Sequence, residues 1–213
     1  MNMKKNLVTA MLMTLATTLL LGIGYPLLVT GLSQILFRDK ANGQLIVEKG
    51  KVVGSHLIGQ PFSGRGYFHS RPSAAGVGYD AANSGPSNLG PTNQKLIDRV
   101  SSAVAAERLQ NSNWLVPIDL VTTSASGLDP DISPAAALFQ VARVARERGF
   151  TEQAVQSMVQ QHLTQRQLGF LGEPRVNVLE LNLALDATVA RKPIEERRLH
   201  SQAENLTRGT KNE

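Results

Sequence analysis

The feature that most constrains this chain is an uninterrupted apolar stretch near its N-terminus. Residues Asn6 to Phe37 include no Asp, Glu, Lys, Arg or His, and the most apolar part, Leu7 to Val29, is 23 residues long. At about 1.5 Å per residue a helix of that length reaches about 35 Å, which exceeds the roughly 30 Å of a bilayer's hydrocarbon core. The stretch therefore predicts one transmembrane helix.

Two other interpretations of this stretch fit it less well. A cleaved signal peptide also begins with basic residues, and Lys4 and Lys5 precede the apolar stretch here. Its apolar region is typically about 7–15 residues and ends in a small-residue cleavage site, and Gly31 to Gln34 has no such pattern. A buried core helix of a soluble protein would carry a polar face. We therefore expect an uncleaved membrane anchor.

The flanking charges do not decide the orientation alone, because Lys and Arg stand on both sides of the stretch. A short basic tail before the first apolar segment is typical of a signal anchor, and long domains translocate largely regardless of charge. We predict a cytoplasmic tail over 1–6, the transmembrane helix and its outer end over 7–37, a periplasmic domain over 38–190, and a charged, flexible tail over 191–213.

Small side chains recur every four residues along the predicted membrane helix, at Ala10, Thr14, Thr18 and Gly22. Residues at this spacing share one face, and such a stripe lets two membrane helices approach closely. The alternative is chance, because Ala and Thr are common in this stretch. Farther along, Gly24 and Pro26 predict a kink or fraying near the outer end.

Composition and motifs exclude several classes of function. The 213 residues carry a net charge of +5, but the basic residues do not gather with aromatic ones, so nucleic-acid binding is not expected. Cysteine is absent, which excludes disulfides, thiolate metal sites and a Cys nucleophile. No G-x-S-x-G, H-E-x-x-H or phosphate-loop motif occurs. We expect no catalytic residue, no metal site and no cofactor of the chain's own.

The four histidines do not change that expectation. His162 lies on the apolar stripe of a predicted helix, where a satisfied core histidine is the usual role. His56 and His69 could meet in space, but the 12 residues between them give no metal-ligand spacing. His200 stands in the charged tail.

The chain after the membrane helix predicts a single soluble α+β domain with a small sheet and several helices. Residues 44–47 and 51–58 predict a β-hairpin. The Gly- and Pro-rich stretch 60–93 predicts a long functional loop, with a short strand at Tyr67 to His69. Residues 114–121 predict another strand despite Pro117.

Four helices are predicted from apolar periodicity and capping residues. The first covers 93–109 with Thr92 as its N-cap. The second covers 135–148, between Ser133 with Pro134 and Gly149. The third follows the cap Thr151 and carries an apolar stripe through Leu163 until Gly169 breaks it. The fourth begins at Asn177, paired with Glu180 in a variant capping box, and runs to Val189; alternation in this last segment would also suit a strand.

The run Ser124 to Pro134, SASGLDPDISP, is the most unusual in the domain. Small hydroxyl residues and Gly before a helix N-terminus can cradle an anion. However, Asp129 and Asp131 would repel phosphate, and no Lys follows. We favour a loop of defined shape in which Asp129 and Ser133 cap the following helix, with the nearby Asp119 and Asp131 complementing its dipole.

Several motifs in this order resemble the C subunit of the Kdp potassium-transporting ATPase. Besides the run just described, they are Gly54-Ser55, Leu57 to Phe62, Tyr67 to His69, Arg71 to Ala74, Ser87 to Gly90, Arg143 to Ala145, and Leu171 to Asn177. The resemblance extends from Lys5 to about Ala190 and includes the N-terminal span. One departure is Asp131, where the family often has His.

The resemblance implies a non-catalytic subunit of a bacterial inner-membrane potassium pump. Its partners would be a channel-like A subunit, a P-type ATPase B subunit, a small fourth subunit and the lipid bilayer, with ATP and K⁺ belonging to the complex. The family is described as a catalytic chaperone that raises the ATP affinity of the B subunit. Its counterparts of Ser124, Ser126 and Gly127 have been likened to a nucleotide signature. An external domain cannot touch cytoplasmic ATP, so our predicted topology argues against that contact.

Two rival functions stay open. One is a membrane-anchored periplasmic hydrolase, which the missing catalytic motifs disfavour. The other is a periplasmic module that concentrates K⁺ near a pore through Asp129 and Asp131. Potassium sites are usually built from carbonyl oxygens rather than carboxylates, which disfavours it.

Overall fold

The computed structural model of the chain describes residues 3–112 and 114–188. The tail predicted over 191–213, including His200, and the predicted helix end at Val189 lie outside the described residues. The chain divides between Ser55 and His56 into two compact units, and each is described by itself. The domain boundaries drawn from the sequence stay predictions.

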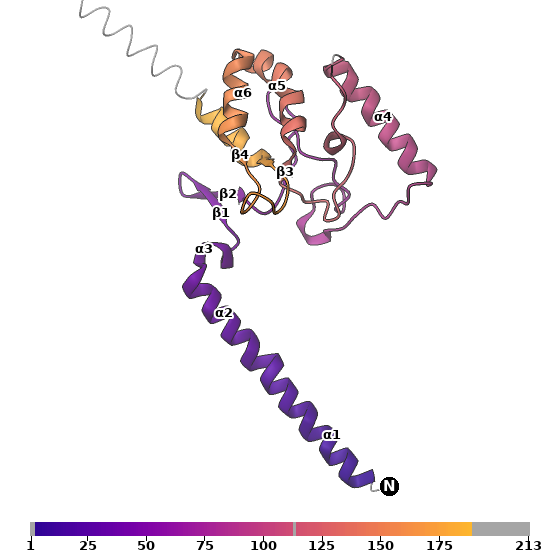
Figure 1. The fold of residues 1–213 in the computed structure, drawn as a ribbon, viewed down its shortest axis with the longest axis vertical. Coiled ribbons are helices and arrows are strands. Elements are labelled where there is room, and N and C mark those ends of the chain that lie inside the picture. The colour runs from indigo at the N-terminus through magenta and orange to yellow at the C-terminus, as the bar shows by residue number, and fades with distance from the viewer. Residues whose placement is uncertain (1–2, 113, 189–213) are drawn as a thin grey trace, which may run out of the picture. The chain divides into compact units, whose positions relative to one another are not determined.

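The first unit begins with a helical run of 34 residues whose apolar window has a mean hydropathy of 2.0 (Figure 1, indigo). It consists of α1 (Met3–Thr17), the π-helical segment η1 (Thr18–Gly24) and α2 (Tyr25–Leu36). None of its residues is buried. By length and composition it can cross a bilayer once, in agreement with the predicted single span.

The irregularity predicted near Gly24 and Pro26 takes the form of a wide turn rather than a frayed end. The helix continues through Pro26, which lies in the first turn of α2, and Tyr25 N–H donates to the carbonyl of Leu20, five residues back. Proline has no N–H to give an α-helical bond, so a π-turn before it re-accommodates the freed carbonyls.

A short helix, α3 (Arg38–Ala41), leads into a two-stranded antiparallel hairpin of β1 (Leu45–Glu48) and β2 (Lys51–Ser55). Lys49 and Gly50 both have positive φ, 50° and 77°, as a two-residue type I′ turn requires. The predicted hairpin is confirmed. Its second strand ends at Ser55 rather than at residue 58. At that end the Ser55 hydroxyl donates a hydrogen bond to the carbonyl of Gly43 at 2.7 Å.

The second unit packs helices against a small antiparallel sheet, and the predicted α+β class is confirmed. Figure 1 shows α5 and α6 side by side above the strands. The sheet order is β3-β5-β4. The elements of this core are β3 (Asp131–Ile132), α5 (Pro134–Arg148), α6 (Glu152–Gln161), β4 (Leu163–Thr164), β5 (Arg175–Asn177) and the helical residues 178–188. The largest fully buried side chains of this unit are Phe139, Leu181 and Leu185 from these elements and Phe68 from the loop that precedes them.

Helix α5 is the centre of this core, with eight buried residues. The Ser133 hydroxyl accepts a hydrogen bond from Ala136 N–H at 3.2 Å, Pro134 occupies the first turn, and Gly149 ends the helix at φ 65°. These are the caps predicted from the sequence.

The strand predicted at Tyr67 to His69 is wrong. Phe68 N–H donates to Asn182 Oδ1 at 2.8 Å, and its carbonyl accepts from Asn182 Nδ2 at 2.9 Å. The next backbone N–H, of His69, donates to Gln140 Oε1 at 2.8 Å. Side-chain amides from two helices thus satisfy a backbone that a neighbouring strand would otherwise satisfy.

Two predictions around α4 (Gln94–Gln110) need correction. Its N-cap is Asn93 rather than Thr92, because Asn93 Oδ1 accepts from Lys95 N–H at 2.9 Å. The strand predicted over 114–121 is also wrong, since the segment contains the 3₁₀ helix η3 (Ile118–Leu120). The Ile118 carbonyl accepts from Thr122 Oγ1 at 2.8 Å, which closes a local turn in place of a sheet ladder.

Helix α6 is shorter than predicted, although its cap Thr151 is confirmed by a bond from Ala154 N–H at 3.2 Å. It ends at Gln161 rather than near Gly169. Leu163 leaves the stripe and pairs with Val176 in the sheet, where pairing to β5 satisfies its backbone.

The last predicted helix is present over its described residues, 178–188, and the strand alternative is wrong. Asn177 Oδ1 caps it by accepting from Glu180 N–H at 3.2 Å. The capping box is only half formed, because the Glu180 carboxylate pairs with His56 instead of turning back.

Candidate functional site

The polar groups of the Ser124–Pro134 loop are largely used within the loop itself. The Ser124 hydroxyl accepts from Gly127 N–H at 2.9 Å, and the Ser126 hydroxyl accepts from Leu128 N–H at 3.1 Å. The two hydroxyl oxygens lie 3.3 Å apart. A phosphate cradle needs N–H groups that point at the ligand, and two such groups are already occupied here.

Neighbouring segments bind the carbonyls of the same loop. The Ser126 carbonyl accepts from Gly85 N–H at 2.8 Å and from the Ser84 hydroxyl at 2.9 Å. The Ser73 hydroxyl donates to the Gly127 carbonyl at 2.6 Å. The loop thus fastens the long segment 60–93 to the domain.

Gly127 is the residue that permits this fastening. Its φ is +67°, and an added Cβ would lie 2.7 Å from Ala75 N and 2.9 Å from the Gly85 carbonyl. A left-handed backbone and two backbone atoms at that distance leave room only for glycine.

The sequence analysis predicted that Asp129 caps the following helix, and this prediction is wrong. Its Oδ2 accepts from Arg71 Nη1 at 3.1 Å, and its Oδ1 accepts from Asp131 N–H at 3.1 Å. The carboxylate that bonds to the N-terminal end of α5 is that of Asp119, whose Oδ2 accepts a hydrogen bond from Ser133 N–H at 2.7 Å. Capping propensity is local, whereas Arg71 reaches Asp129 from 58 residues away, and the ion pair takes the carboxylate.

These acidic residues line a cavity of about 420 Å³ together with Arg71, Ser133, Glu173 and Arg175. Asp131 Oδ2 lies 2.9 Å from Arg175 Nε. Burial raises the pKa of Asp131 above its ordinary value, and the nearby Arg175 guanidinium opposes that rise. Since the carboxylates already bind cationic or N–H partners, the cavity is poorly suited to hold K⁺.

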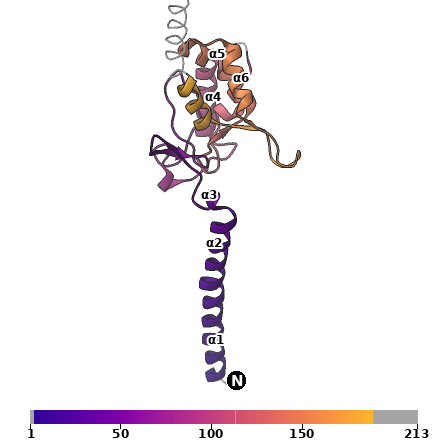
Figure 2. The same cartoon turned by 90° about the vertical axis from the view of Figure 1, so that its left-hand side faces the viewer.

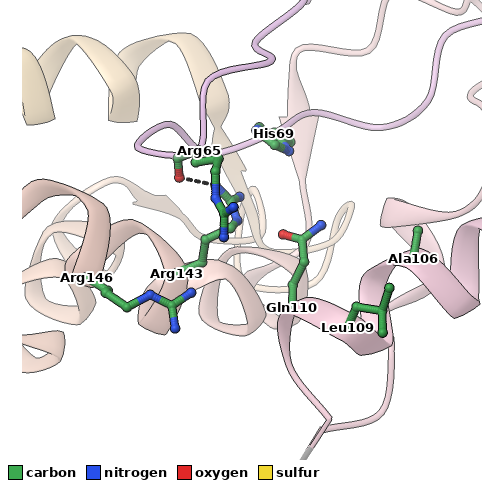
Figure 3. Close-up of a pocket in the computed structure, with 7 residues that line it drawn as sticks. All are labelled: Arg65, His69, Ala106, Leu109, Gln110, Arg143 and Arg146. Carbon is green, nitrogen blue, oxygen red and sulfur yellow. Dashed lines mark hydrogen bonds between the residues drawn. The ribbon is translucent and has the colours of Figure 1, made fainter.

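A second cavity, of about 380 Å³, was not foreseen from the sequence. It is lined by three arginines and no carboxylate: Arg65, His69, Ala106, Leu109, Gln110, Arg143 and Arg146 (Figure 3). The signal available in the sequence was weak, because these residues come from three separate segments. Its chemistry suits an anionic group.

Arg143 is the buried member of this cavity, at 4% exposure. Its Nη1 donates to the carbonyls of Arg65 and Tyr67, and its Nη2 donates to Gln140 Oε1 at 2.7 Å. Because of these three hydrogen bonds, Arg143 serves chiefly to hold the loop around Tyr67 against α5. Its charge also adds to the effect of burial in lowering the pKa of His69.

Each of the three histidines within the described residues bonds to a different partner. His56 Nδ1 contacts Glu180 Oε1, His69 Nε2 donates to the Gly64 carbonyl at 3.0 Å, and His162 Nδ1 lies 2.8 Å from the Met158 carbonyl. His162 is half-buried just past the end of α6. Among residues 3–112 and 114–188, no three His, Asp or Glu side chains gather as metal ligands.

The predicted stripe in the membrane helix lines a surface groove of about 590 Å³. Ala10, Thr14 and Thr18 contribute to it, with Met11, Leu12 and Leu15. An added Cβ on Gly22 would lie 3.7 Å from Thr18 Cγ2, so these two residues are neighbours on the helix. A groove floored by small residues can admit the ridge of another helix.

Comparison with known proteins identifies the family. Residues 7–187 match the family model described as KdpC, the c chain of the K⁺-transporting ATPase. A potassium-transporting ATPase KdpC subunit of Koribacter versatilis is 63% identical over 186 residues, which covers 87% of this chain and 96% of the relative. Those of Acidobacterium capsulatum and Rhodospirillum rubrum are 58% and 55% identical, covering 84% and 86% of this chain and 96% of each relative. The chain therefore belongs to the KdpC family of K⁺-transporting ATPase subunits.

Proposed function

We propose that this accessory subunit of the K⁺-transporting ATPase acts in assembly and stability of the complex and does not itself handle ATP. Its N-terminus lies in the cytoplasm and its folded domain on the periplasmic side of the inner membrane. Its partners are the channel-like A subunit, the P-type ATPase B subunit and the small fourth subunit. ATP and K⁺ bind to those partners.

The observation that carries this proposal is the closed state of the Ser124–Gly127 loop. The hydroxyls of Ser124 and Ser126 accept hydrogen bonds from N–H groups of the loop itself. Gly127 packs closely against backbone atoms of a neighbouring segment. Asp129 and Asp131 add negative charge beside it, which repels phosphate. This construction supports a scaffold role for the loop and argues against the chaperone description that requires nucleotide contact.

The unburied helix of the first unit supports an assembly role. A helix that is apolar on all sides needs lipid or other helices around it. The groove along Ala10, Thr14 and Thr18 is where a partner helix would pack.

Thr18→Ile should fill the groove and loosen the complex, whereas Leu19→Ile, a change of shape at constant volume, should be mild.

Orientation is tested with one cysteine, because the native chain has none. Asn83 is exposed, so Asn83→Cys provides an accessible probe. A membrane-impermeant thiol reagent should label it from outside intact cells once the outer membrane is permeable. Labelling only after the inner membrane is broken would place the domain in the cytoplasm.

Nucleotide binding is tested on the purified full-length chain and on the complex. Ser126→Ala should leave the apparent ATP affinity of the complex unchanged and lower the melting temperature of the purified chain, because Leu128 N–H loses its acceptor. Calorimetry that detects tight, adenine-dependent binding to the chain alone, abolished by Ser126→Ala, would restore the nucleotide role.

A further inference from the structure

The cavity at Arg143 is bounded by three parts of the second unit. It is lined by the loop that carries Arg65, by the C-terminal end of α4 and by the C-terminal half of α5. Figure 1 shows α4 beside α5 on the side away from α6, and Figure 2 shows α4 at the level of both helices. The cavity's volume of about 380 Å³ is in the range of pockets that bind small molecules.

Arg143 brings a positive charge to this cavity that no bonded carboxylate offsets. It is buried, and its Nη atoms donate only to neutral acceptors, which are the carbonyls of Arg65 and Tyr67 and the side-chain amide of Gln140. Among residues 3–112 and 114–188, its Nε has no hydrogen-bond partner and its guanidinium forms no ion pair. Because a buried charge is costly unless it is paired, an anion beside Arg143 would lower this cost.

A second arginine with an unpartnered Nε comes from α4. Within the described residues, Arg99 Nε is also buried without a hydrogen-bond partner. Arg99 precedes Ala106 by seven residues and Gln110 by eleven, and these spacings place all three on one face of the helix. The face of α4 that lines the cavity therefore also carries a positive charge.

The carboxylates nearby offset only part of this positive charge. Glu147 pairs with Arg65 at 3.2 Å, and that arginine side chain is 72% exposed. Glu107 is half-buried on α4, where burial raises its pKa and the charge of Arg143 opposes that rise. Arg146 is exposed in the last turn of α5 and pairs with no carboxylate in the described part of the chain. Guanidinium groups therefore outnumber carboxylates around the cavity.

The arrangement of donors favours an oxyanion of the phosphate type. A guanidinium presents its N–H groups in a planar fork that matches the oxygens of a carboxylate or a phosphate. Arg65 lines the cavity from the loop, Arg143 and Arg146 line it from α5, and Gln110 lines it from α4 (Figure 3). A tetrahedral phosphate group offers oxygens in several directions, whereas a carboxylate offers two in one plane.

We propose that the cavity between α4 and α5 binds a phosphate-type oxyanion, with Arg65 and Arg146 donating to its oxygens and Arg143 supplying buried positive charge. Inorganic phosphate and the phosphodiester headgroup of a phospholipid share this chemistry. The inference goes beyond the proposed function and does not rest on it, because it requires neither a particular orientation of the domain nor the other subunits. The site is also separate from the Ser124–Gly127 loop, whose residues do not line this cavity.

The test is calorimetry of the purified full-length chain in detergent, titrated with inorganic phosphate at constant ionic strength. The wild-type chain should bind one phosphate saturably. Arg146→Gln should weaken binding about tenfold, the loss expected for one charge-assisted hydrogen bond. Arg146 is exposed, so this change leaves the core intact, whereas replacing Arg143 would also release the loop that it holds.

Lys95→Gln is the matched control, because it removes one positive charge from an exposed position of α4. Lys95 stands eleven residues before Ala106, or about 16 Å along the helix, which exceeds the screening length of about 10 Å at 0.1 M salt. The phosphate affinity of this variant should equal that of wild type. Glu107→Gln should instead strengthen phosphate binding, since it removes a nearby negative charge.

Melting curves of the same chains separate binding from folding. Saturating phosphate should raise the melting temperature of wild type and of Lys95→Gln, because a ligand of the folded state stabilises it. The same phosphate concentration should raise that of Arg146→Gln much less. A wild-type chain that binds neither inorganic phosphate nor a soluble phosphodiester would overturn the inference, and so would an equal loss of affinity in Arg146→Gln and Lys95→Gln.

The source of the oxyanion is distinguished by repeating the titration with glycerophosphoglycerol, the deacylated headgroup of phosphatidylglycerol. Tighter binding of inorganic phosphate assigns the site to the free ion, and tighter binding of the diester assigns it to a lipid headgroup. In both cases Arg146→Gln should weaken binding. A loss of affinity in Ser126→Ala with none in Arg146→Gln would place the anion at the Ser124–Gly127 loop, and the cavity proposal would be wrong.

Discussion

Two loops of the second unit use the same backbone chemistry in opposite ways. One is Ser124–Gly127, and the other is the exposed hairpin from Gln165 to Pro174 between β4 and β5, which we call the 165–174 finger. Each has a glycine at positive φ and hydrogen bonds that fix its shape. The first loop directs its carbonyls to neighbouring segments and buries its glycine against them. The finger bonds only to itself at its tip and leaves its apolar side chains in solvent. The first loop therefore shapes the domain, whereas the second is exposed and adds little to the domain's core.

The largest expected contrast is between the two glycines. Gly127→Ala should lower the free energy of unfolding by about 3 kcal/mol or more, because the new Cβ meets two backbone atoms below 3 Å in addition to the left-handed strain. Gly169→Ala should cost only about 1 kcal/mol, the strain alone, because nothing lies within 4 Å of its Cβ position. Urea unfolding of the full-length chain in detergent measures both. Equal losses would remove the distinction between the loops.

A smaller contrast is expected between the ion pairs of the two regions. Arg71 donates to the Thr122 and Thr123 carbonyls and to Asp129, and its side chain is 24% exposed. Arg71→Ala should cost about 2 kcal/mol, because it leaves a half-buried carboxylate and carbonyls without donors.

The matched change in the finger is Arg166→Ala. Its partner Glu173 is 78% exposed, and an exposed pair contributes only about 0–1 kcal/mol. The same unfolding experiment should show a loss within about 0.5 kcal/mol of zero. A large loss here would mean that the finger supports the domain, contrary to the comparison.

The smallest effect concerns pH. Burial raises the pKa of Asp131 in the folded state, so between the unfolded and folded pKa values the folded state binds more protons. Its unfolding free energy therefore rises as pH falls through the folded pKa. The difference in stability between wild type and Asp131→Asn should shift in favour of wild type as the pH is lowered from 7. A difference that is constant with pH would show that Asp131 keeps its ordinary pKa.

Some features of this protein follow from local sequence alone. The membrane helix follows from 32 consecutive residues without charge, and helix α5 follows from Ser133, Pro134 and Gly149. In both cases the deciding residues are neighbours in the chain, so the physical preference is visible without knowing the fold. The family was also recognisable, because its motifs are short and occur in order.

Other features were decided only by the tertiary structure. Phe68 is bonded by Asn182, 114 residues away, and Asp129 is bonded by Arg71, 58 residues away. These long-range partners replaced the strand and the helix cap that local preferences had predicted. The positive φ of Leu168 likewise has no local signal, since leucine avoids that conformation. Local propensities differ by about 1 kcal/mol or less, so one good hydrogen bond or ion pair from a distant residue is enough to override them.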